Sequence, residues 1–202
     1  MKALDFNLPN EIKFDFNEGL TTFGDSRLLI FDAGSIGLLR QTILELVGAE
    51  KAQEALFRFG FKNGFADHLQ LKHSHDFDSE MDLLASGPVI HTWEGIVSAT
   101  PSAISFDRAS GAFDFTGVWR NSYEAEQYLS FNDTASEPVC WSLTGYASGW
   151  CTAFWGQPLL AVEPQCVGKG DPSCGWDIRP IEKHEPANRR MGSVVMAVLR
   201  GE

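Results

Sequence analysis

All four cysteines of this 202-residue chain lie in the single stretch from Cys140 to Cys174. Cys166 and Cys174 flank the segment VGKGDPS, whose glycines and proline allow the backbone to turn so that two thiolates approach each other. Glu163 adds a carboxylate nearby, and Cys140 and Cys151 are the candidates to complete a tetrahedral metal site from a distance. Because the spacing matches none of the common CxxC patterns, buried free thiols are an equally good interpretation of some of these cysteines.

The composition is that of one compact domain without a surface for nucleic acid. With 44% hydrophobic residues the chain can bury about 70% of the surface that its unfolded form exposes. The formal net charge of −11 argues against direct contact with DNA or RNA, which depends on clustered Lys and Arg. No apolar run approaches the ~20 residues of a membrane span and no secretory signal opens the chain, so we expect a cytoplasmic location. There, metal binding or buried thiols explain the cysteines better than disulfides do.

Apolar periodicity predicts several helices. SIGLLRQTILELVG is amphipathic, with Ser35 as a possible N-cap and Gly48 at its end, and a second helix begins near Ala49. SYEAEQYL predicts a short helix capped by Ser122. KHSHDFDSE holds two histidines and two aspartates, but its polar composition favours a solvated loop over a metal site.

Two helices carry paired glycines that favour a tight crossing. Gly60 and Gly64 lie four residues apart on one face of the helix that begins near Ala49, so another helix can approach closely there. PVCWSLTGYASGWCTAFWG predicts a further helix, in which Gly145 and Gly149 have the same spacing. We expect that this second helix crosses closely over another element.

The remaining apolar segments predict strands. Residues 28–31 form one expected strand, and residues 89–99 form another after a break at Gly87 and Pro88, which places His91 and Trp93 on one strand face. DRASG predicts the turn of a hairpin between residues 103–106 and 113–119. PLLAVEPQC and CGWDIRP lead into and out of the cysteine loop as strands. The predicted fold is α+β, with mixed helices on a mostly antiparallel sheet and a metal-binding lobe in the C-terminal half.

Several blocks together resemble one family. GYASGWCTAFWGQPLLAVEPQCVGKGDPSC resembles the small-ligand domain of the vinyl-reductase type. FDAGSIGLLRQTILELVGAEKAQEALFRFGFKNG, LLASGPVIHTWEGIV and PVCWSLTGYASGW resemble the N-terminal sensor region of XylR/DmpR-type bacterial enhancer-binding transcriptional activators, which respond to aromatic pollutants. The similarity spans roughly residues 15–180, and the blocks occur in the family's order.

The resemblance implies a zinc ion held by Cys140, Glu163, Cys166 and Cys174, which leaves Cys151 as a buried thiol. It also implies an aromatic effector between the expected strand of His91 and that of Trp119, with these two side chains bonded to the ligand hydroxyl. A neutral imidazole offers one donor and one acceptor and an indole offers one donor, so the pair can hold a phenolic oxygen from two sides. On the residues alone, a core histidine bonded to backbone groups is the favoured explanation of His91, and the resemblance reverses that preference.

The chain departs from the family's small-phenol sensors where relatives carry bulky aromatic residues. Leu84, Gly117 and Ala161 stand at these positions. We therefore expect a larger cavity and a bulkier ligand, such as a hydroxylated biphenyl. The expected ligand-binding residues are His91, Trp119, Leu84, Gly117, Trp150 and Ala161.

The resulting organisation has an N-terminal dimerisation segment over residues 1–34, a sensor domain over 35–180 and a zinc lobe at about 138–178. Residues 181–202 are expected to be a linker towards an absent ATPase domain, because VVMAVL near the end has no obvious partner. The predicted function is effector binding by a homodimeric sensor without catalysis, which relays the signal to ATPase and DNA-binding domains. The alternative is a small zinc enzyme of reductase or lyase type that acts on an aromatic substrate. Four protein ligands would leave zinc no open position, which favours the sensor.

Overall fold

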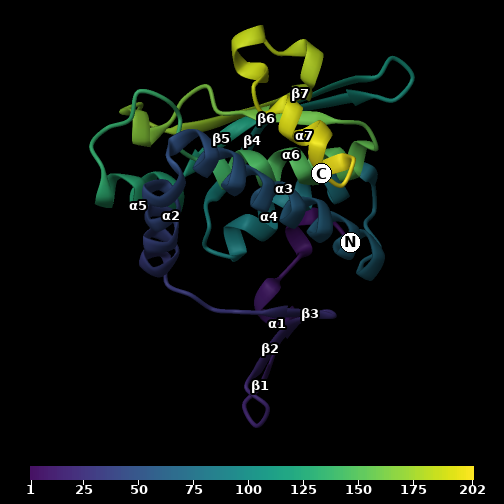
Figure 1. Cartoon of the computed structure of the whole chain (residues 1–202). Coiled ribbons are helices and arrows are strands. Elements are labelled where there is room, and N and C mark those ends of the chain that lie inside the picture. Colours follow the sequence, from purple (N-terminus) through teal and green to yellow (C-terminus); the bar gives the residue numbers. More distant parts are fainter.

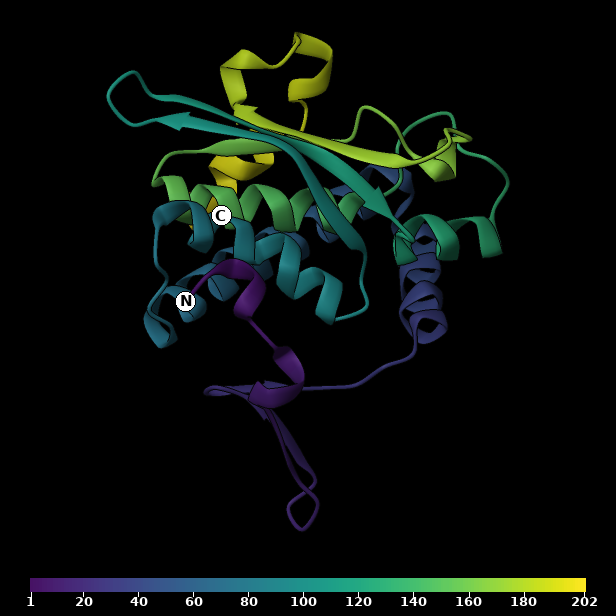
Figure 2. The same cartoon turned by 180° about the vertical axis from the view of Figure 1, so that it is seen from behind.

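A four-stranded antiparallel sheet forms one layer of the protein, as the computed structural model of residues 1–202 shows (Figures 1 and 2). The strand order is β4-β5-β7-β6, with bounds Ser98–Asp107 for β4, Ala112–Arg120 for β5, Leu159–Val162 for β6 and Cys174–Pro180 for β7. Along β5 buried and partly buried residues alternate, so Phe113, Phe115 and Trp119 face the helices. The expected hairpin and the strands flanking the cysteine loop are confirmed.

Three helices lie on one side of this sheet: α3 (Ala49–Ser74), α4 (Glu80–Trp93) and α6 (Trp141–Trp155). Helix α6 lies between the sheet and α3 (Figure 2). A Cβ atom on Gly60 or Gly64 would overlap the backbone carbonyls of Ser142 or Tyr146 of α6, and one on Gly145 or Gly149 would overlap those of Phe57 or Phe61 of α3. The predicted tight crossing is therefore confirmed, and the two glycine pairs belong to one backbone-to-backbone contact.

Helix α4 corrects the prediction for residues 89–99. The chain remains helical through Gly87 and Pro88 up to Trp93, and the strand begins only at Ser98. Proline lacks the N–H that would bond to the carbonyl four residues earlier, which is that of Leu84. That carbonyl instead accepts a hydrogen bond of 3.1 Å from Trp150 Nε1, and the Trp150 ring fills the space where a Gly87 side chain would stand. A side chain from α6 thus replaces the missing bond and keeps His91 on a helix.

Two further helices lie beside this core: α2 (Ala33–Val47) and α5 (Tyr123–Phe131). Asp32, not Ser35, caps α2 and accepts a hydrogen bond of 2.9 Å from Ser35 N. Ser122 caps α5 as predicted. The predicted loop KHSHDFDSE begins only at His75, because α3 extends to Ser74.

The N-terminal residues form a separate hairpin-like sheet of β1 (Ile12–Asp15), β2 (Leu20–Phe23) and β3 (Ser26–Leu28), preceded by the one-turn α1 (Leu8–Glu11). This sheet projects away from the body (Figure 1). The strand expected at residues 28–31 ends at Leu28. Short 3-10 helices occur at Ala3–Asp5, Val167–Lys169, Ile181–Lys183 and Pro186–Arg189.

The C-terminal segment does not match the expectation of an unpartnered tail. VVMAVL belongs to α7 (Gly192–Leu199), and its Val194 and Val195 pack in a small cluster with Phe57, Phe61 and Leu160. The segment therefore contributes to this domain's own core. No helix has the length and apolarity needed to cross a bilayer.

Candidate functional sites: a metal centre and an aromatic pocket

Cys140, Glu163, Cys166 and Cys174 meet where α6 begins, β6 ends and β7 begins. One potential ligand atom from each lies within 4.8 Å of every other, and all four residues are buried. The Sγ atoms of Cys140 and Cys174 are 3.8 Å apart. Tetrahedral zinc with bonds of about 2.3 Å places two sulfur ligands about 3.8 Å apart. The structure brings the four expected residues together, and the spacing of their ligand atoms suits a tetrahedral metal ion such as zinc.

Backbone amides orient the sulfur and oxygen atoms of this group. Val139 N donates to Cys166 Sγ at 3.4 Å and Val167 N donates to Cys174 Sγ at 3.2 Å. Cys140 N donates to Glu163 Oε2 at 3.0 Å, whereas Glu163 Oε1 is buried without a hydrogen-bond partner. The unpaired oxygen of Glu163 and the three cysteine sulfurs together form a donor set that suits a thiophilic divalent cation. Such a cation would also give the buried oxygen the partner that it lacks.

The charges of the group also fit a cation. Burial raises the pKa of Glu163 to about 9, and the nearby Cys166 raises it further. Burial likewise raises the pKa of the Cys140 thiol, with further contributions from its hydrogen bonds to Cys166 and Cys174. Four acidic groups so close together cannot all ionise unless positive charge is added, and a bound metal would release their protons.

Cys151 lies apart from this group, on α6, where burial raises its pKa and keeps the thiol neutral. The spacing of the cysteines in the sequence did not distinguish Cys151 from the candidate metal ligands, whereas the family resemblance did. With four protein donors at the site, a tetrahedral metal has no position left for water or substrate.

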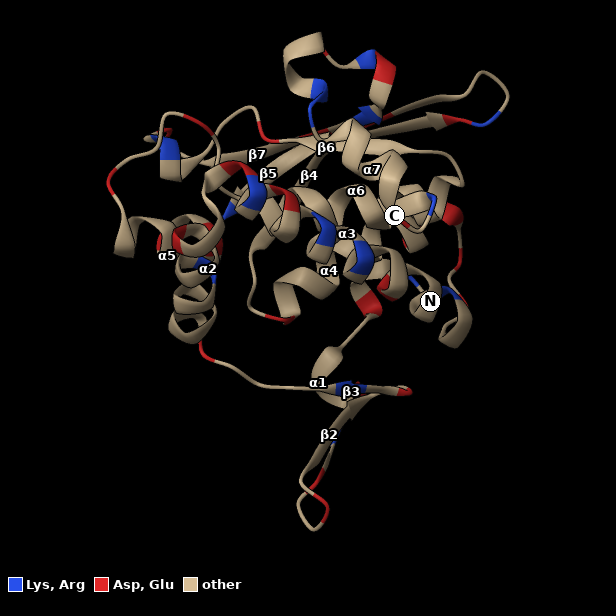
Figure 3. Ribbon diagram, viewed as in Figure 1, with Lys and Arg blue, Asp and Glu red and all other residues tan.

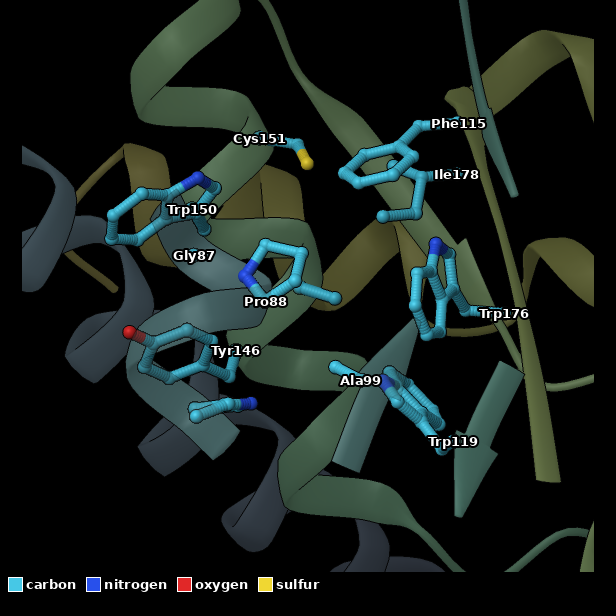
Figure 4. A pocket seen from close by; sticks show the side chains of 12 residues that line it. Gly87, Pro88, Ala99, Phe115, Trp119, Tyr146, Trp150, Cys151, Trp176 and Ile178 are labelled. Atoms are coloured by element: carbon cyan, nitrogen blue, oxygen red, sulfur yellow. The ribbon is translucent and has the colours of Figure 1, made fainter. Parts of the chain in front are cut away.

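The second site is a cavity of about 30 Å³ between the sheet and helices α4 and α6 (Figure 4). Its walls are mainly aromatic and aliphatic, with few polar groups and no Lys, Arg, Asp or Glu. The lining residues are Gly87, Pro88, His91, Ala99, Phe115, Trp119, Tyr146, Ala147, Trp150, Cys151, Trp176 and Ile178.

His91 and Trp119 face this cavity from α4 and β5, so the structure brings the two expected polar contacts together. His91 is 5% exposed, and burial lowers its pKa to about 3, so its imidazole is neutral at physiological pH. Its ring packs against that of Tyr146, with centroids 3.7 Å apart and the ring planes tilted by 37°. No protein group is hydrogen-bonded to the ring nitrogens of His91 or Trp119, whereas the indole of Trp150 is bonded to Leu84 O. The interpretation of His91 as a core histidine satisfied by backbone groups is not supported.

Leu84, Gly117 and Ala161 do not line the cavity, although they were expected to. A Cβ atom on Gly117 would overlap Cζ2 and Cη2 of Trp176 and lie 2.6 Å from Thr100 O. Trp176 is the cross-strand partner of Gly117 and covers it. The expected enlargement is therefore absent at Gly117, because an indole from β7 fills the space.

Residues missed by the sequence reasoning include Tyr146, Cys151 and Trp176. Tyr146 and Trp150 could have been placed together, because positions four apart on α6 share a face. Trp176 could not have been, since its contact with Gly117 depends on the register between β5 and β7.

Comparisons with known proteins show similarity to regulators of aromatic catabolism. A family model described as "Activator of aromatic catabolism" matches residues 7–107. The phenol regulator MopR of Acinetobacter guillouiae is 28% identical over 182 residues, which are 90% of this chain and 32% of that protein. The transcriptional regulatory protein XylR of Pseudomonas putida is 28% identical over 168 residues, or 83% of this chain and 30% of that protein. The chain spans about a third of the length of these curated relatives.

The fold also matches a solved structure. The crystal structure of the phenol-responsive sensory domain of the transcription activator PoxR with phenol has a TM-score of 0.86 to this chain and 30% sequence identity. The match covers 97% of this chain and 94% of that chain.

Proposed function

The chain belongs to the family of activators of aromatic catabolism, and we propose that its cavity is the site where an uncharged phenolic effector binds. The observation that carries this proposal is the pair of polar side chains, His91 and Trp119, that face an otherwise apolar cavity without hydrogen-bond partners of their own. The neutral imidazole can accept the hydroxyl proton and the indole N–H can donate to the hydroxyl oxygen.

Size and charge restrict the ligand further. The cavity of about 30 Å³ holds no more than a few water molecules, so a ring must displace side chains as it binds. Ligand binding is thus coupled to a rearrangement of the walls, which a sensor requires. The lining offers no cation to a carboxylate, and burial of an unpaired charge is costly. Neutral single-ring phenols fit these conditions better than biphenyls or aromatic acids.

Calorimetric titration with phenol and toluene tests the proposal. Burial of the ring supplies most of the affinity for both ligands, whereas a His and a Trp left unpaired by toluene cost about 1–3 kcal/mol. Phenol should bind about tenfold more tightly or better. The variants His91→Ala and Trp119→Phe should lose this preference, and Phe131→Leu, an exposed change on α5, should retain it. Equal binding of phenol and toluene by the unmodified chain would rule out the polar pair.

We assign Zn²⁺ to the four-residue centre. The three thiols and one carboxylate would hold it, and it would tie the start of α6 to the loop between β6 and β7. Its role is structural, because this loop contributes few apolar residues to the core and thiolate binding stabilises such segments.

We infer that a second copy of this chain covers an apolar surface of its N-terminal part. The surface comprises exposed residues of the projecting sheet, of the connection to α2 and of α2: Phe14, Phe16, Leu29, Ile30, Phe31, Leu38, Leu39 and Leu46. They are 51–89% exposed, and α2 carries few charges (Figure 3). Exposed apolar side chains in this number favour a protein interface. The proposed partner is a second copy of this chain, in agreement with the homodimer expected from the sequence. Phe6 and Leu8 do not belong to this surface, because they are already buried within one chain.

The remaining proposals concern the part of the curated relatives that this chain does not cover. We propose that residues 181–202 lead to the ATPase and DNA-binding domains of a longer regulator, with α7 docked on the sensor. A change in the pocket reaches α7 through α6 and α3, which pack against each other; α7 packs on Phe57 and Phe61 of α3 and on Leu160 of β6. A cytoplasmic location is part of this proposal.

A further inference from the structure

Trp176 places an indole against a glycine on the neighbouring strand. Gly117 of β5 and Trp176 of β7 are directly paired, and the six-membered ring of Trp176 lies where a side chain at position 117 would stand. The ring packs edge-on to Phe115, with centroids 5.8 Å apart, and lies 5.2 Å from the Trp119 ring. Trp176 of β7 therefore forms the part of the cavity wall that a side chain at position 117 of β5 would otherwise form (Figure 4).

The indole nitrogen of Trp176 is a hydrogen-bond donor without an acceptor. The side chain is 3% exposed, and Nε1 is buried with no partner. Its neighbours in the cavity wall, Phe115 and Ile178, carry no side-chain oxygen or nitrogen. Buried indole N–H groups normally bond to an acceptor, as that of Trp150 does with Leu84 O.

The other polar groups of the lining are already assigned. Tyr146 donates its hydroxyl proton to Asp67 at 3.0 Å, Trp150 is bonded to the backbone, and His91 and Trp119 are the proposed partners of the effector hydroxyl. A phenol with one oxygen atom would therefore leave Trp176 unpaired. An effector with a second, uncharged oxygen atom would pair it.

We propose that Trp176 is a specificity-determining residue whose indole N–H donates to a second neutral oxygen substituent of the effector. The preferred ligand class is then a single-ring phenol with a methoxy, hydroxyl or carbonyl substituent, not phenol itself and not a two-ring phenol. This inference rests on the proposed function, because it takes the cavity as the effector site.

Matched ligand pairs isolate the proposed bond. Each of the 2-, 3- and 4-methoxyphenols has as many heavy atoms as the corresponding ethylphenol and carries an acceptor oxygen in place of a CH2 group. Calorimetric titration should show, for at least one pair, that the methoxyphenol binds about tenfold more tightly than the ethylphenol. Trp176→Phe should bring the two members of that pair within about twofold, and changes in pocket size cancel because both ligands meet the same variant.

Trp119→Phe is the control, since it should weaken both members of the pair equally and preserve their ratio. A preference that persists in Trp176→Phe, or the absence of any preference in the unmodified chain, overturns the inference. Phenol and toluene, titrated in the same series, test the proposed function separately: if phenol has no advantage, both the function and this inference fall. If phenol has its advantage and no methoxy pair does, only the inference falls.

Should Trp176→Phe not fold, the unmodified chain provides a second readout. The indole N–H signal of Trp176 in a ¹H–¹⁵N correlation spectrum should move downfield with the preferred methoxyphenol and not with its ethylphenol counterpart. Identical spectra with the two ligands would contradict the proposed bond.

Discussion

Replacing the buried His68 of α3 by Phe should make the domain more resistant to acid. His68 is 0% exposed, and neither ring nitrogen has a hydrogen-bond partner. Its ring lies edge-on to Trp150 and Phe154, with centroids 5.1 Å and 6.0 Å away. Burial, aided by nearby Lys72, lowers its pKa from 6.5 to about 4. A Phe ring can occupy this aromatic site without a group that takes up a proton.

The magnitude follows from the two pKa values. Below pH 6.5 the unfolded chain binds a proton at His68 that the folded chain does not bind until about pH 4, so folding stability falls as the pH falls through this range. At about pH 5 the linkage amounts to about 2 kcal/mol relative to neutral pH. Burial raises the pKa of Asp67 to about 6, so this residue makes folding stability rise as the pH falls. Asp67 is present in the unmodified protein and in the variant, so its contribution cancels in the comparison.

Urea unfolding of the unmodified chain and His68→Phe at about pH 7.5 and pH 5 measures this difference. The unmodified chain should lose about 2 kcal/mol more than the variant over this interval. His73→Phe removes an exposed imidazole from the same helix and controls for the loss of a histidine as such. Parallel pH profiles for the unmodified chain and His68→Phe would refute the reasoning.

Three further predictions concern metal, packing and assembly. Cys174→Ser should lower zinc stoichiometry and soluble yield, whereas Cys151→Ser should leave both unchanged, as measured by elemental analysis; equal loss in both variants would contradict the assignment. Gly64→Ala should destabilise the fold by about 2–3 kcal/mol, because the new methyl group meets the Tyr146 carbonyl, while Asn63→Ala on the exposed face should change stability by less than about 0.5 kcal/mol in the same urea experiment. Joint replacement of Ile30 and Leu46 by Ser should shift the mass measured by light scattering from dimer to monomer, and replacement of the exposed Leu69 of α3 should not; an unchanged mass in the first variant would remove the proposed interface.

Local sequence patterns predicted much of the fold, because the features concerned depend on residues that are close together in the sequence. In α3 and in α6, two glycines four residues apart leave one helix face without side chains. Two such faces allow the helix backbones to cross closely. Turn residues fixed the hairpin between β4 and β5 in the same way. The metal residues needed the family resemblance, because Cys140 lies 23 residues before Glu163 and nothing local joins them.

The errors arose where a distant residue overrides a local preference. Gly87 and Pro88 favour a helix end, but Trp150 from α6 fills the space beside the glycine and bonds the carbonyl that the proline leaves free. Gly117 favours an enlarged cavity until Trp176 is placed opposite it. In both cases a tryptophan from another element occupies the room that a glycine leaves, and only the three-dimensional register shows which tryptophan does so.

The central claim is that a phenolic hydroxyl is held by His91 and Trp119 in the cavity. A ¹H–¹⁵N spectrum of the tryptophan indoles, recorded with and without saturating phenol, tests it most directly. The Trp119 signal should move, because its N–H gains an acceptor, while those of Trp93 and Trp141, which already donate to the carbonyls of Phe6 and Pro138, should stay in place. An unchanged Trp119 signal under saturating phenol would contradict the account.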